Sequence, residues 1–508
     1  MLFNSFIFIF LYLPVVITGF FILAGVSRAF AAGWLALASL FFYGYWNPAY
    51  VGLLLMSIVF NYLIGVSIAH AVKQQKQKKK KQILTFAVSV NIALLAYYKY
   101  ANFFVSNVNI ITGTEWNIGS IVLPLGISFF TFTQIAFLVD SYQGKVKEYN
   151  FIHYLLFVTY FPHLIAGPVL HHKQMMPQFD LKATYKISCE NLAIGTAFFS
   201  IGLAKKVLLA DSLAEYATPV FQAADNGVQI QFFGAWVGAL AYTFQLYFDF
   251  SGYSDMAIGI SRMFGVTLPI NFNSPYKAKN IIEFWRSWHI TLSQFLREYL
   301  YFPLGGNRKG PIQRYINLLI TMLLGGFWHG ANWTFVVWGG LHGIYLCINH
   351  AWANIFKNTP EHLNRFKQIV SMLLTFLAVV FGWVFFKAST ISAAITVIKG
   401  MIGLNGISLP MSFAFLDKWI NSTDLGIRYI GLFPNMSMPL EITTLIFWFT
   451  LSFFIIWGLP NSQEFLDGRG LKSKPIPQII YMGILLGALF SLSLMSFDRI
   501  SEFLYFQF

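Results

Sequence analysis

Hydrophobic runs of about 20 residues recur from one end of the chain to the other and predict membrane-spanning helices, because an α-helix of that length crosses a hydrocarbon core of roughly 30 Å. Two further apolar stretches, 121–140 and 152–170, contain prolines and glycines that break helices and favour re-entrant segments. A short segment near 253–270 is ambiguous. The eleven predicted spans are 6–26, 29–46, 50–70, 83–105, 191–211, 232–250, 316–331, 333–354, 369–388, 441–459 and 477–496.

The composition agrees with a chain that lies in lipid for most of its length. Hydrophobic residues make up 57% of the 508 positions, aromatic residues 19% and charged residues only 11%. A water-soluble protein of this size needs a more charged surface. We therefore expect one all-α polytopic membrane domain over residues 1–508. The first apolar run lacks a basic segment before it, so we expect a first transmembrane helix and not a cleaved signal peptide.

Basic residues set the expected orientation. The net charge is +14, and the stretch KQQKQKKKKQ at 73–82 holds six lysines and no acid. Because such loops stay on the cytoplasmic side, the loop Lys73–Lys81 is expected in the cytoplasm and the N-terminus outside. Excess Lys and Arg in a polytopic chain reflects this rule, so no nucleic acid partner is expected. Two cysteines far apart, Cys189 and Cys347, indicate neither a disulfide framework nor a thiolate metal site.

One histidine is expected deep in the membrane. The segment MLLGGFWHGANWTFVVWGGLHG (322–343) contains His329 and His342, and residues 315–356 contain no Lys, Arg, Asp or Glu. A helix that rises about 1.5 Å per residue from Arg314 places His329 roughly 20 Å from the inner face. A structural histidine inside a helix bundle is one reading. The other is a general base, because a neutral imidazole can take a proton from an attacking hydroxyl. His342 and His350 are expected to be structural.

A second polar motif follows a different period. In IIEFWRSWHITLSQFLREYLYFPLGG (281–306) apolar residues recur at three- and four-residue steps, which predicts an amphipathic helix. Its other face gathers Arg286, His289, Ser293 and Arg297 and would suit an interface or a watery cavity. The next turn, PLGGNRKG (303–310), is rich in glycine and basic residues, but it lacks the P-loop pattern.

Carboxylates near the apolar spans are few. Asp249 and Asp255 in YFDFSGYSD (247–255) should pair or face water. We favour a helix-capping role for Asp249 or Ser251 over an ion pair. No zinc or other metal site is predicted from the histidines, because no H-E-x-x-H or Cys/His ligand spacing occurs. The G-x-S-x-G elbow of serine hydrolases is also absent from the sequence.

Taken together, these motifs resemble those of the membrane-bound O-acyltransferase (MBOAT) family, in its bacterial alginate and peptidoglycan O-acetyltransferase branch. The resemblance covers nearly the whole chain, with core motifs at 121–354. The stretches that carry it are GISFFTFTQIAFLVDSYQGK (126–145), YFPHLIAGPV (160–169), YFDFSGYSDMAIGISRMFG (247–265), NFNSPYKAKNIIEFWRSWHITLSQFLREYLYFPLGGNRKG (271–310), GGFWHGANWTFVVWGGLHG (325–343) and FLYFQF (503–508).

The resemblance implies a ring of about 11–13 transmembrane and re-entrant helices around a thin centre, with funnels from both faces. The histidine of the family's W-H-G motif maps to His329 and that of its R-S-W-H motif to His289. Such enzymes take an acyl group from a cytoplasmic donor and pass it outward, commonly to a separate extracytoplasmic protein that acetylates a polysaccharide. The implied location is the bacterial cytoplasmic membrane.

These implications lead to a set of site residues. His329 and His289 are the candidate catalytic residues, and Trp328 and Asn332 the candidate positioning residues. Acetyl-CoA or another acyl thioester is the expected donor, with no permanently bound cofactor. The last members of the set are the candidates for binding the donor phosphates, which rest only on positive charge near the expected inner mouth: Arg286, Arg308 and Lys309.

Two rival functions stay open at this point. Within the family, the alternative is D-alanyl transfer from a carrier protein to teichoic acid, which would need a carrier-docking patch and not a nucleotide pocket. Outside it, the alternative is a solute transporter or channel, since buried polar groups and broken helices also line transport paths. The chain shows no evident inverted repeat that would favour transport.

Overall fold

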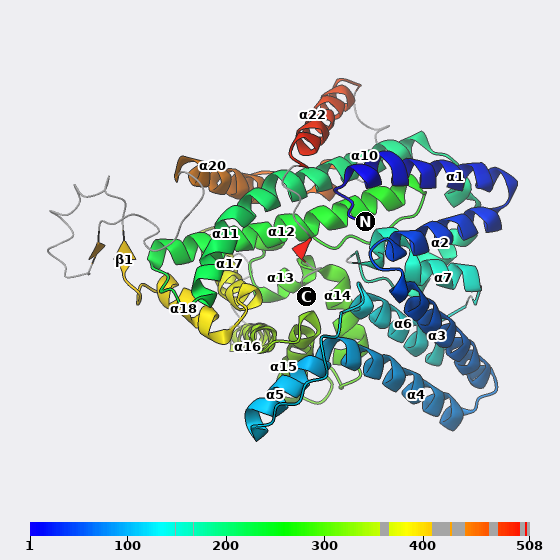
Figure 1. Ribbon diagram of the computed structural model, residues 1–508, viewed down its shortest axis with the longest axis horizontal. Coiled ribbons are helices and arrows are strands. Elements are labelled where there is room, and N and C mark those ends of the chain that lie inside the picture. The colour runs from blue at the N-terminus through cyan, green and yellow to red at the C-terminus, as the bar shows by residue number, and fades with distance from the viewer. Residues whose placement is uncertain are drawn as a thin grey trace. The chain divides into compact units, whose positions relative to one another are not determined.

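The computed structural model shows an all-α polytopic membrane protein (Figure 1). It describes residues 1–147, 149–165, 167–355, 365–408, 427–428, 442–466, 476–497 and 503–504. Six helices in these parts are long and apolar enough to cross a membrane, judged by length and composition. The predicted membrane class is therefore confirmed. Most of the FLYFQF motif lies outside the described residues.

The chain forms two compact units that interleave along the sequence, and each is described by itself. The first comprises Met1–Ala204, Ser251–Asn271 and Ser462–Gln507, and the second Lys205–Phe250 and Phe272–Asn461. The boundaries fall after α10 and within α12. The expectation of one membrane domain over 1–508 stays a prediction.

The first unit consists of antiparallel and crossing helices, with α1 beside α2, α3 beside α4 and α6, and α10 beside α22. Its π-helical turns η1 and η2 are continuous with α1 and α5. The bounds of its helices are η1 (Phe8–Tyr12), α1 (Leu13–Val26), α2 (Arg28–Gly44), α3 (Ala49–Lys73), α4 (Gln77–Leu95), η2 (Ala96–Tyr100), α5 (Ala101–Thr112), α6 (Ile127–Tyr142), α7 (Phe151–Thr159), α8 (Phe161–Leu164), α9 (His172–Met175), η3 (Met176–Asp180), η4 (Lys182–Tyr185), α10 (Cys189–Ala204), α21 (Ser462–Leu466) and α22 (Ile476–Met495).

The second unit is built around the adjacent helices α15 and α16, with α17 beside α16. A pair of two-residue parallel strands, β1 (Ile407–Ser408) and β2 (Ile427–Arg428), is the only sheet among the described residues. The other bounds are η5 (Lys205–Ala210), α11 (Asp211–Asp225), the part of α12 (Phe232–Met263) up to residue 250, η6 (Pro275–Lys277), α13 (Ile281–Ser287), α14 (Ile290–Leu296), η7 (Arg297–Tyr301), α15 (Pro311–His329), α16 (Trp333–Ile355), α17 (Arg365–Lys387), α18 (Ile391–Met401), α20 (Ile442–Phe453) and η10 (Phe454–Gly458).

Every predicted span overlaps a helix, but their lengths differ from the expectation. Helix α2 and the α20–η10 segment each have 17 residues and count as shorter apolar helices. Helix α12 runs for 32 residues, from Phe232 to Met263, and includes most of the ambiguous segment near 253–270. The predicted span ended at residue 250 because polar residues interrupt the apolar run there. The predicted breaks are confirmed: α6 begins only after Gly126, and α7 and α8 are short.

Buried amides link three helices of the first unit. Asn61 on α3 donates its side-chain amide to the Gln134 carbonyl oxygen on α6 at 2.7 Å, and Asn91 on α4 donates to Asn61 at 2.7 Å. All three side chains are at most 1% exposed. Because a buried amide without partners is costly, these bonds fix how α3, α4 and α6 face one another.

Glycines allow α15 and α16 to approach closely. A Cβ atom at Gly326 would overlap the carbonyl oxygen of Phe335, and one at Gly339 would overlap that of Met322. At Gly330, just after α15, a Cβ would overlap the ring of Phe335. Small residues at such contacts let membrane helices pack backbone to backbone. The glycines around His329 therefore serve helix packing, which brings the last turn of α15 against α16.

Candidate active site

His329 is the last residue of α15, and its imidazole is enclosed by aromatic rings. The side chain is 5% exposed. Its ring centroid lies 4.8 Å from that of Trp328, 5.1 Å from that of Trp338 and 5.1 Å from that of Phe386. The interplanar angles are 69°, 90° and 71°, so each pair meets edge to face. The surroundings are apolar but rich in π electrons.

The turn after His329 is held by Asn332. Its side-chain oxygen accepts from the backbone N–H of Thr334 at 3.0 Å, in the first turn of α16. Its Nδ2 donates to the carbonyl oxygen of Ser389, which follows α17, at 2.7 Å. Asn332 therefore ties the α15–α16 turn to the end of α17, and α17 carries the Phe386 ring that contacts His329. The positioning role of Asn332 in catalysis stays a prediction.

A second aromatic layer surrounds His342. This residue is fully buried, and its Nδ1 lies 3.3 Å from the Trp285 Nε1, which donates to it. Its ring centroid lies 4.9 Å from that of Trp338, one turn earlier on α16. Because Nδ1 accepts, the proton of the neutral ring sits on Nε2. His342 thus links α13 to α16 and contacts the ring that faces His329, in line with the structural role predicted for it.

His289 does not lie on one continuous amphipathic helix, and this prediction was wrong. The helix is interrupted between α13 and α14, where the backbone of His289 adopts the left-handed conformation with φ 42°. Arg286 and Arg297 are exposed, whereas His289 is fully buried with its ring 4.7 Å from that of Phe250. The spacing of apolar residues could not predict this interruption, because it does not show where a single residue takes a positive φ.

The electrostatic state of His289 follows from its burial. The residue lies between two short helices, outside the long apolar ones. Burial lowers the pKa of His289 to about 3, so the ring is neutral at physiological pH. A left-handed backbone at a residue with a side chain is uncommon, and such conformations cluster at functional sites. The side chain is fully buried, which differs from the watery surroundings that its polar stripe suggested.

The three candidate phosphate-binding residues are exposed. Arg286 lies near the end of α13, while Arg308 and Lys309 lie in the turn between η7 and α15. That turn uses three glycines with positive φ, and the buried Asn317 amide donates to the Gly306 carbonyl oxygen at 2.8 Å. Arg308 and Lys309 therefore lie on a turn that a buried hydrogen bond holds in place. It shows no contact that joins them to Arg286.

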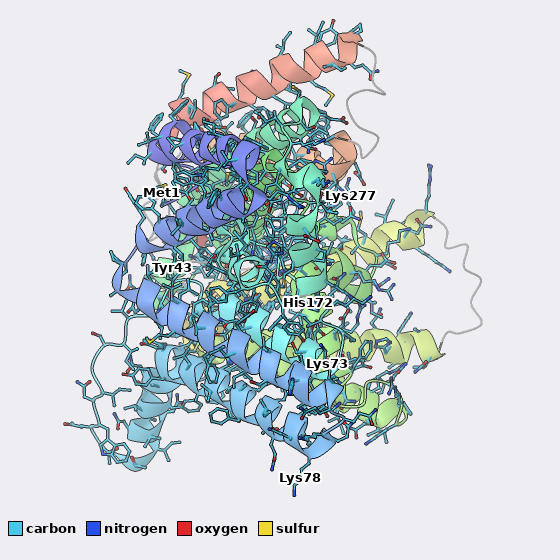
Figure 2. The ribbon with its side chains drawn as sticks, turned by 90° about the vertical axis from the view of Figure 1, so that its right-hand side faces the viewer. Met1, Tyr43, Lys73, Lys78, His172 and Lys277 are labelled. Carbon is cyan, nitrogen blue, oxygen red and sulfur yellow. The ribbon has the colours of Figure 1, made fainter. Side chains whose placement is uncertain are left out.

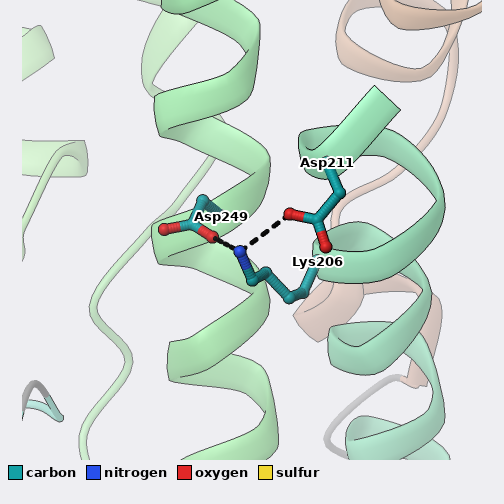
Figure 3. A network of polar contacts seen from close by, with 3 residues as sticks. All are labelled: Lys206, Asp211 and Asp249. Carbon is teal, nitrogen blue, oxygen red and sulfur yellow. Dashed lines mark hydrogen bonds and ion pairs between the residues drawn. The ribbon is translucent and has the colours of Figure 1, made fainter. Parts of the chain in front are cut away.

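A buried cluster of charges lies in the second unit (Figure 3). Lys206 Nζ lies 2.8 Å from Asp211 Oδ1 and 2.7 Å from Asp249 Oδ1, and all three side chains are at most 4% exposed. Lys206 and Asp211 are five residues apart, and the π-helical turn η5 has the i to i+5 period that places them on one face. Asp249 lies inside α12, so the predicted capping role is wrong. The ion pair we did not favour is the one observed.

The first unit contains a histidine and carboxylate pair that the sequence reasoning missed. His172 Nδ1 lies 3.0 Å from Asp140 Oδ2, with both side chains at most 6% exposed. Asp140 lies in α6, which buries it. Figure 2 shows His172 among packed side chains, whereas Lys78 points outward at the start of α4. The sequence alone does not mark this acid as buried, because its partner His172 lies 32 residues further along the chain.

The residues that could hold a metal ion do not gather in the described parts of the chain. No group of three or more His, Cys, Asp or Glu side chains with suitable geometry occurs there. Asp255, the other acid of the YFDFSGYSD motif, accepts a hydrogen bond from Ser462 Oγ at 2.5 Å. Among the buried imidazoles, His329 and His342 both lie among aromatic rings and share contact with Trp338.

The apolar helices define a polytopic membrane protein, and a buried histidine ends its helix α15. A family model described as "MBOAT, membrane-bound O-acyltransferase family" matches residues 40–391, a range that includes His289 and His329. The chain belongs to this family and is an acyltransferase of the membrane.

Named relatives agree with this assignment. The chain is 46% identical over 436 residues to the "Peptidoglycan O-acetyltransferase" of Helicobacter pylori, with 80% of this chain and 81% of the relative covered. It is 44% identical over 399 residues to the "Probable alginate O-acetylase AlgI" of Pseudomonas aeruginosa, with 78% and 73% covered. It is 29% identical over 274 residues to the "Teichoic acid D-alanyltransferase" of Bacillus subtilis, with 52% and 68% covered.

The buried charge cluster makes a prediction about stability. Lys206→Met removes the cation shared by Asp211 and Asp249 and should destabilise the protein by about 3–5 kcal/mol, because carboxylates deprived of a buried partner are costly. Thermal unfolding in detergent, followed by size-exclusion chromatography, measures the change. The matched control is Lys279→Met, which removes an exposed lysine of the same unit.

A compensating variant makes the cause specific. In Lys206→Met combined with Asp211→Asn and Asp249→Asn, the charges are gone together and most of the lost stability should return. An unfolding midpoint for Lys206→Met equal to that of the Lys279→Met control would show that the ion pairs contribute nothing.

Proposed function

We propose that this protein passes an acetyl group from a cytoplasmic acyl thioester across the membrane for O-acetylation of an extracytoplasmic polysaccharide. The observation that carries the proposal is the buried imidazole of His329 at the end of α15, within a chain whose relatives at 46% and 44% identity are named as O-acetyltransferases. Family membership argues against a transporter or channel.

In the proposed reaction, His329 is the general base. The imidazole takes the proton of an acceptor hydroxyl while the hydroxyl oxygen forms a bond to the acyl carbon. The carbon–sulfur bond of the thioester then breaks, and the leaving thiolate takes the proton back. The first step requires a neutral imidazole, because only the neutral ring has a nitrogen free to accept the proton.

His289 has a different part in the proposal. Its neutral ring lies at the break between α13 and α14, and the break ends the helix that carries Arg286. We assign it to the donor side of the site, where an uncharged imidazole can donate or accept a hydrogen bond to the thioester substrate. Trp328 and Asn332 are assigned to positioning His329, Trp328 through its ring contact and Asn332 through its hydrogen bonds in the turn that follows.

The donor is proposed to be acetyl-CoA or another acyl thioester. Phosphates of such a donor need cations, and Arg286, Arg308 and Lys309 are exposed cations outside the long apolar helices. The Gly-rich turn that carries Arg308 and Lys309 also offers backbone N–H groups, which suit phosphate oxygens. Their side of the membrane is the cytoplasm if the lysine-rich segment Lys73–Lys81 is cytoplasmic.

The acceptor side is proposed to involve a partner. We place the protein in the bacterial cytoplasmic membrane with its N-terminus outside. A separate extracytoplasmic protein would receive the acetyl group and finish the transfer onto alginate, peptidoglycan or another exopolysaccharide. D-alanyl transfer to teichoic acid is the less supported alternative, because the D-alanyltransferase relative is 29% identical and covers 52% of this chain.

The catalytic role of His329 gives the first test. His329→Gln should lower acetyl transfer by at least about 100-fold, the usual size of a general-base contribution, while the protein still inserts and purifies normally. Transfer of radioactive acetyl from acetyl-CoA by purified enzyme measures this. The control is His350→Gln on α16, which should keep the wild-type rate. Wild-type transfer by His329→Gln would refute the mechanism.

The donor site gives a second test. The double variant Arg308→Ser, Lys309→Ser should raise the KM for acetyl-CoA about tenfold with kcat changed less than about twofold, because these cations are proposed to bind phosphates and not the reacting atoms. Lys145→Ser removes an exposed lysine on the same expected side and serves as the control. An unchanged KM in the double variant would remove these two residues from the donor site.

A further inference from the structure

Trp338 lies against the imidazole of His329, and no role has yet been assigned to it. It lies on α16 and is 1% exposed. Its ring is perpendicular to that of His329, at 90°, with 5.1 Å between the ring centroids. Trp328 and Phe386 complete the enclosure at 4.8 Å and 5.1 Å. Three aromatic rings within 6 Å of a titratable ring form the kind of cage that binds organic cations.

The position of Trp338 is fixed from behind. Its indole stacks on that of Trp383, with ring centroids 5.6 Å apart and an interplanar angle of 18°. Trp383 Nε1 donates to the Tyr276 hydroxyl at 3.2 Å, and Tyr276 donates to the carbonyl oxygen of Thr243 on α12 at 2.8 Å. The His342 ring packs beside Trp338 at 4.9 Å. Stacking on Trp383, which is itself held by a hydrogen bond, therefore restrains the orientation of the Trp338 indole.

Local charge makes this arrangement chemically relevant. A general base becomes a cation at the moment it takes a proton, and an imidazolium in an apolar surround needs electrostatic stabilisation. Residues 315–356, which cover most of α15 and all of α16, contain no Asp or Glu. The electron-rich groups beside His329 are the aromatic rings of Trp328 on α15, Trp338 on α16 and Phe386 on α17, with centroids 4.8–5.1 Å from that of the imidazole.

We propose that Trp338 is a positioning residue that orients the His329 ring and stabilises its protonated form during acyl transfer by a cation–π interaction. The inference rests on the proposed role of His329 as general base. It adds no proton acceptor: the proton goes from the acceptor hydroxyl to the imidazole and then to the leaving thiolate, while Trp338 stabilises the intermediate charge. Trp338 thereby acts on kcat and not on donor binding.

Fluorinated tryptophans test this role without changing the packing. Each added fluorine withdraws electron density from the indole face and weakens a cation–π interaction, whereas the ring keeps its shape and its N–H. Site-specific incorporation of mono-, di- and trifluorotryptophan at Trp338 should lower kcat stepwise to about a tenth of the wild-type value, with KM for acetyl-CoA unchanged.

A matched series at Trp236 provides the control. Trp236 lies on α12 of the same unit, packs on Phe232 and Phe381, and donates to the Met401 carbonyl oxygen. Fluorination there should leave kcat unchanged. Equal rates along the Trp338 series would overturn the cation–π proposal, because a purely packing role is insensitive to fluorine.

Conventional variants separate this inference from the function on which it rests. Trp338→Phe keeps an aromatic face and should retain more of the kcat than Trp338→Leu, which should lose about two- to thirtyfold. His329→Gln measured beside them decides the base. If His329→Gln is inactive and the fluorine series is flat, only the role of Trp338 fails. If His329→Gln is active, the proposed mechanism fails with it.

Discussion

The account depends on one constraint: a polar, protonatable ring is buried against three aromatic side chains. His329 ends α15 in contact with Trp328, Trp338 and Phe386, and residues 315–356 contain no Asp or Glu. Glycines 326, 330 and 339 make the place possible, since larger residues there would overlap backbone or ring atoms and push α16 away.

The same constraint explains the other buried polar groups. Several of them pair with a partner on another element: Lys206 with its two aspartates, His172 with Asp140, and the amides of α3, α4 and α6 with one another. An apolar solvent offers no alternative partner to these groups, so their pairing selects one arrangement of helices within each unit. The membrane thereby converts a few polar contacts into strong determinants of packing.

Run length and helix-breaking residues could be read from the sequence, whereas local backbone breaks and the ends of helices could not. Apolar length located helices at all eleven predicted spans, and prolines and glycines located the breaks before α6 and after α7. The charge-free stretch around His329 predicted its depth in the membrane, which stays a prediction, but it did not predict the contact with Phe386 on α17. Periodicity could not show the left-handed break at His289, nor could it show that α12 continues past Asp249.

The sequence could not predict which residues pair across the fold, because the partners lie far apart along the chain. Asp249 and Lys206 are 43 residues apart, and Asp140 and His172 are 32 apart, so neither pair leaves a local pattern. The role of Trp338 was also hidden, because a tryptophan in an apolar helix reads as packing until its ring is seen perpendicular to an imidazole. The family motifs supplied what the residue pattern alone did not, above all the candidate role of His289.

The most direct test of the central claim follows the acetyl group through the membrane. Purified enzyme would be reconstituted in one orientation, verified by protease access to the Lys73–Lys81 segment, with radioactive acetyl-CoA on that side and a hydroxyl acceptor with candidate partner proteins on the other. The account predicts label on the far-side acceptor, dependent on His329, with no acetyl-CoA crossing the membrane. Label appearing only on acceptors placed on the donor side would contradict it.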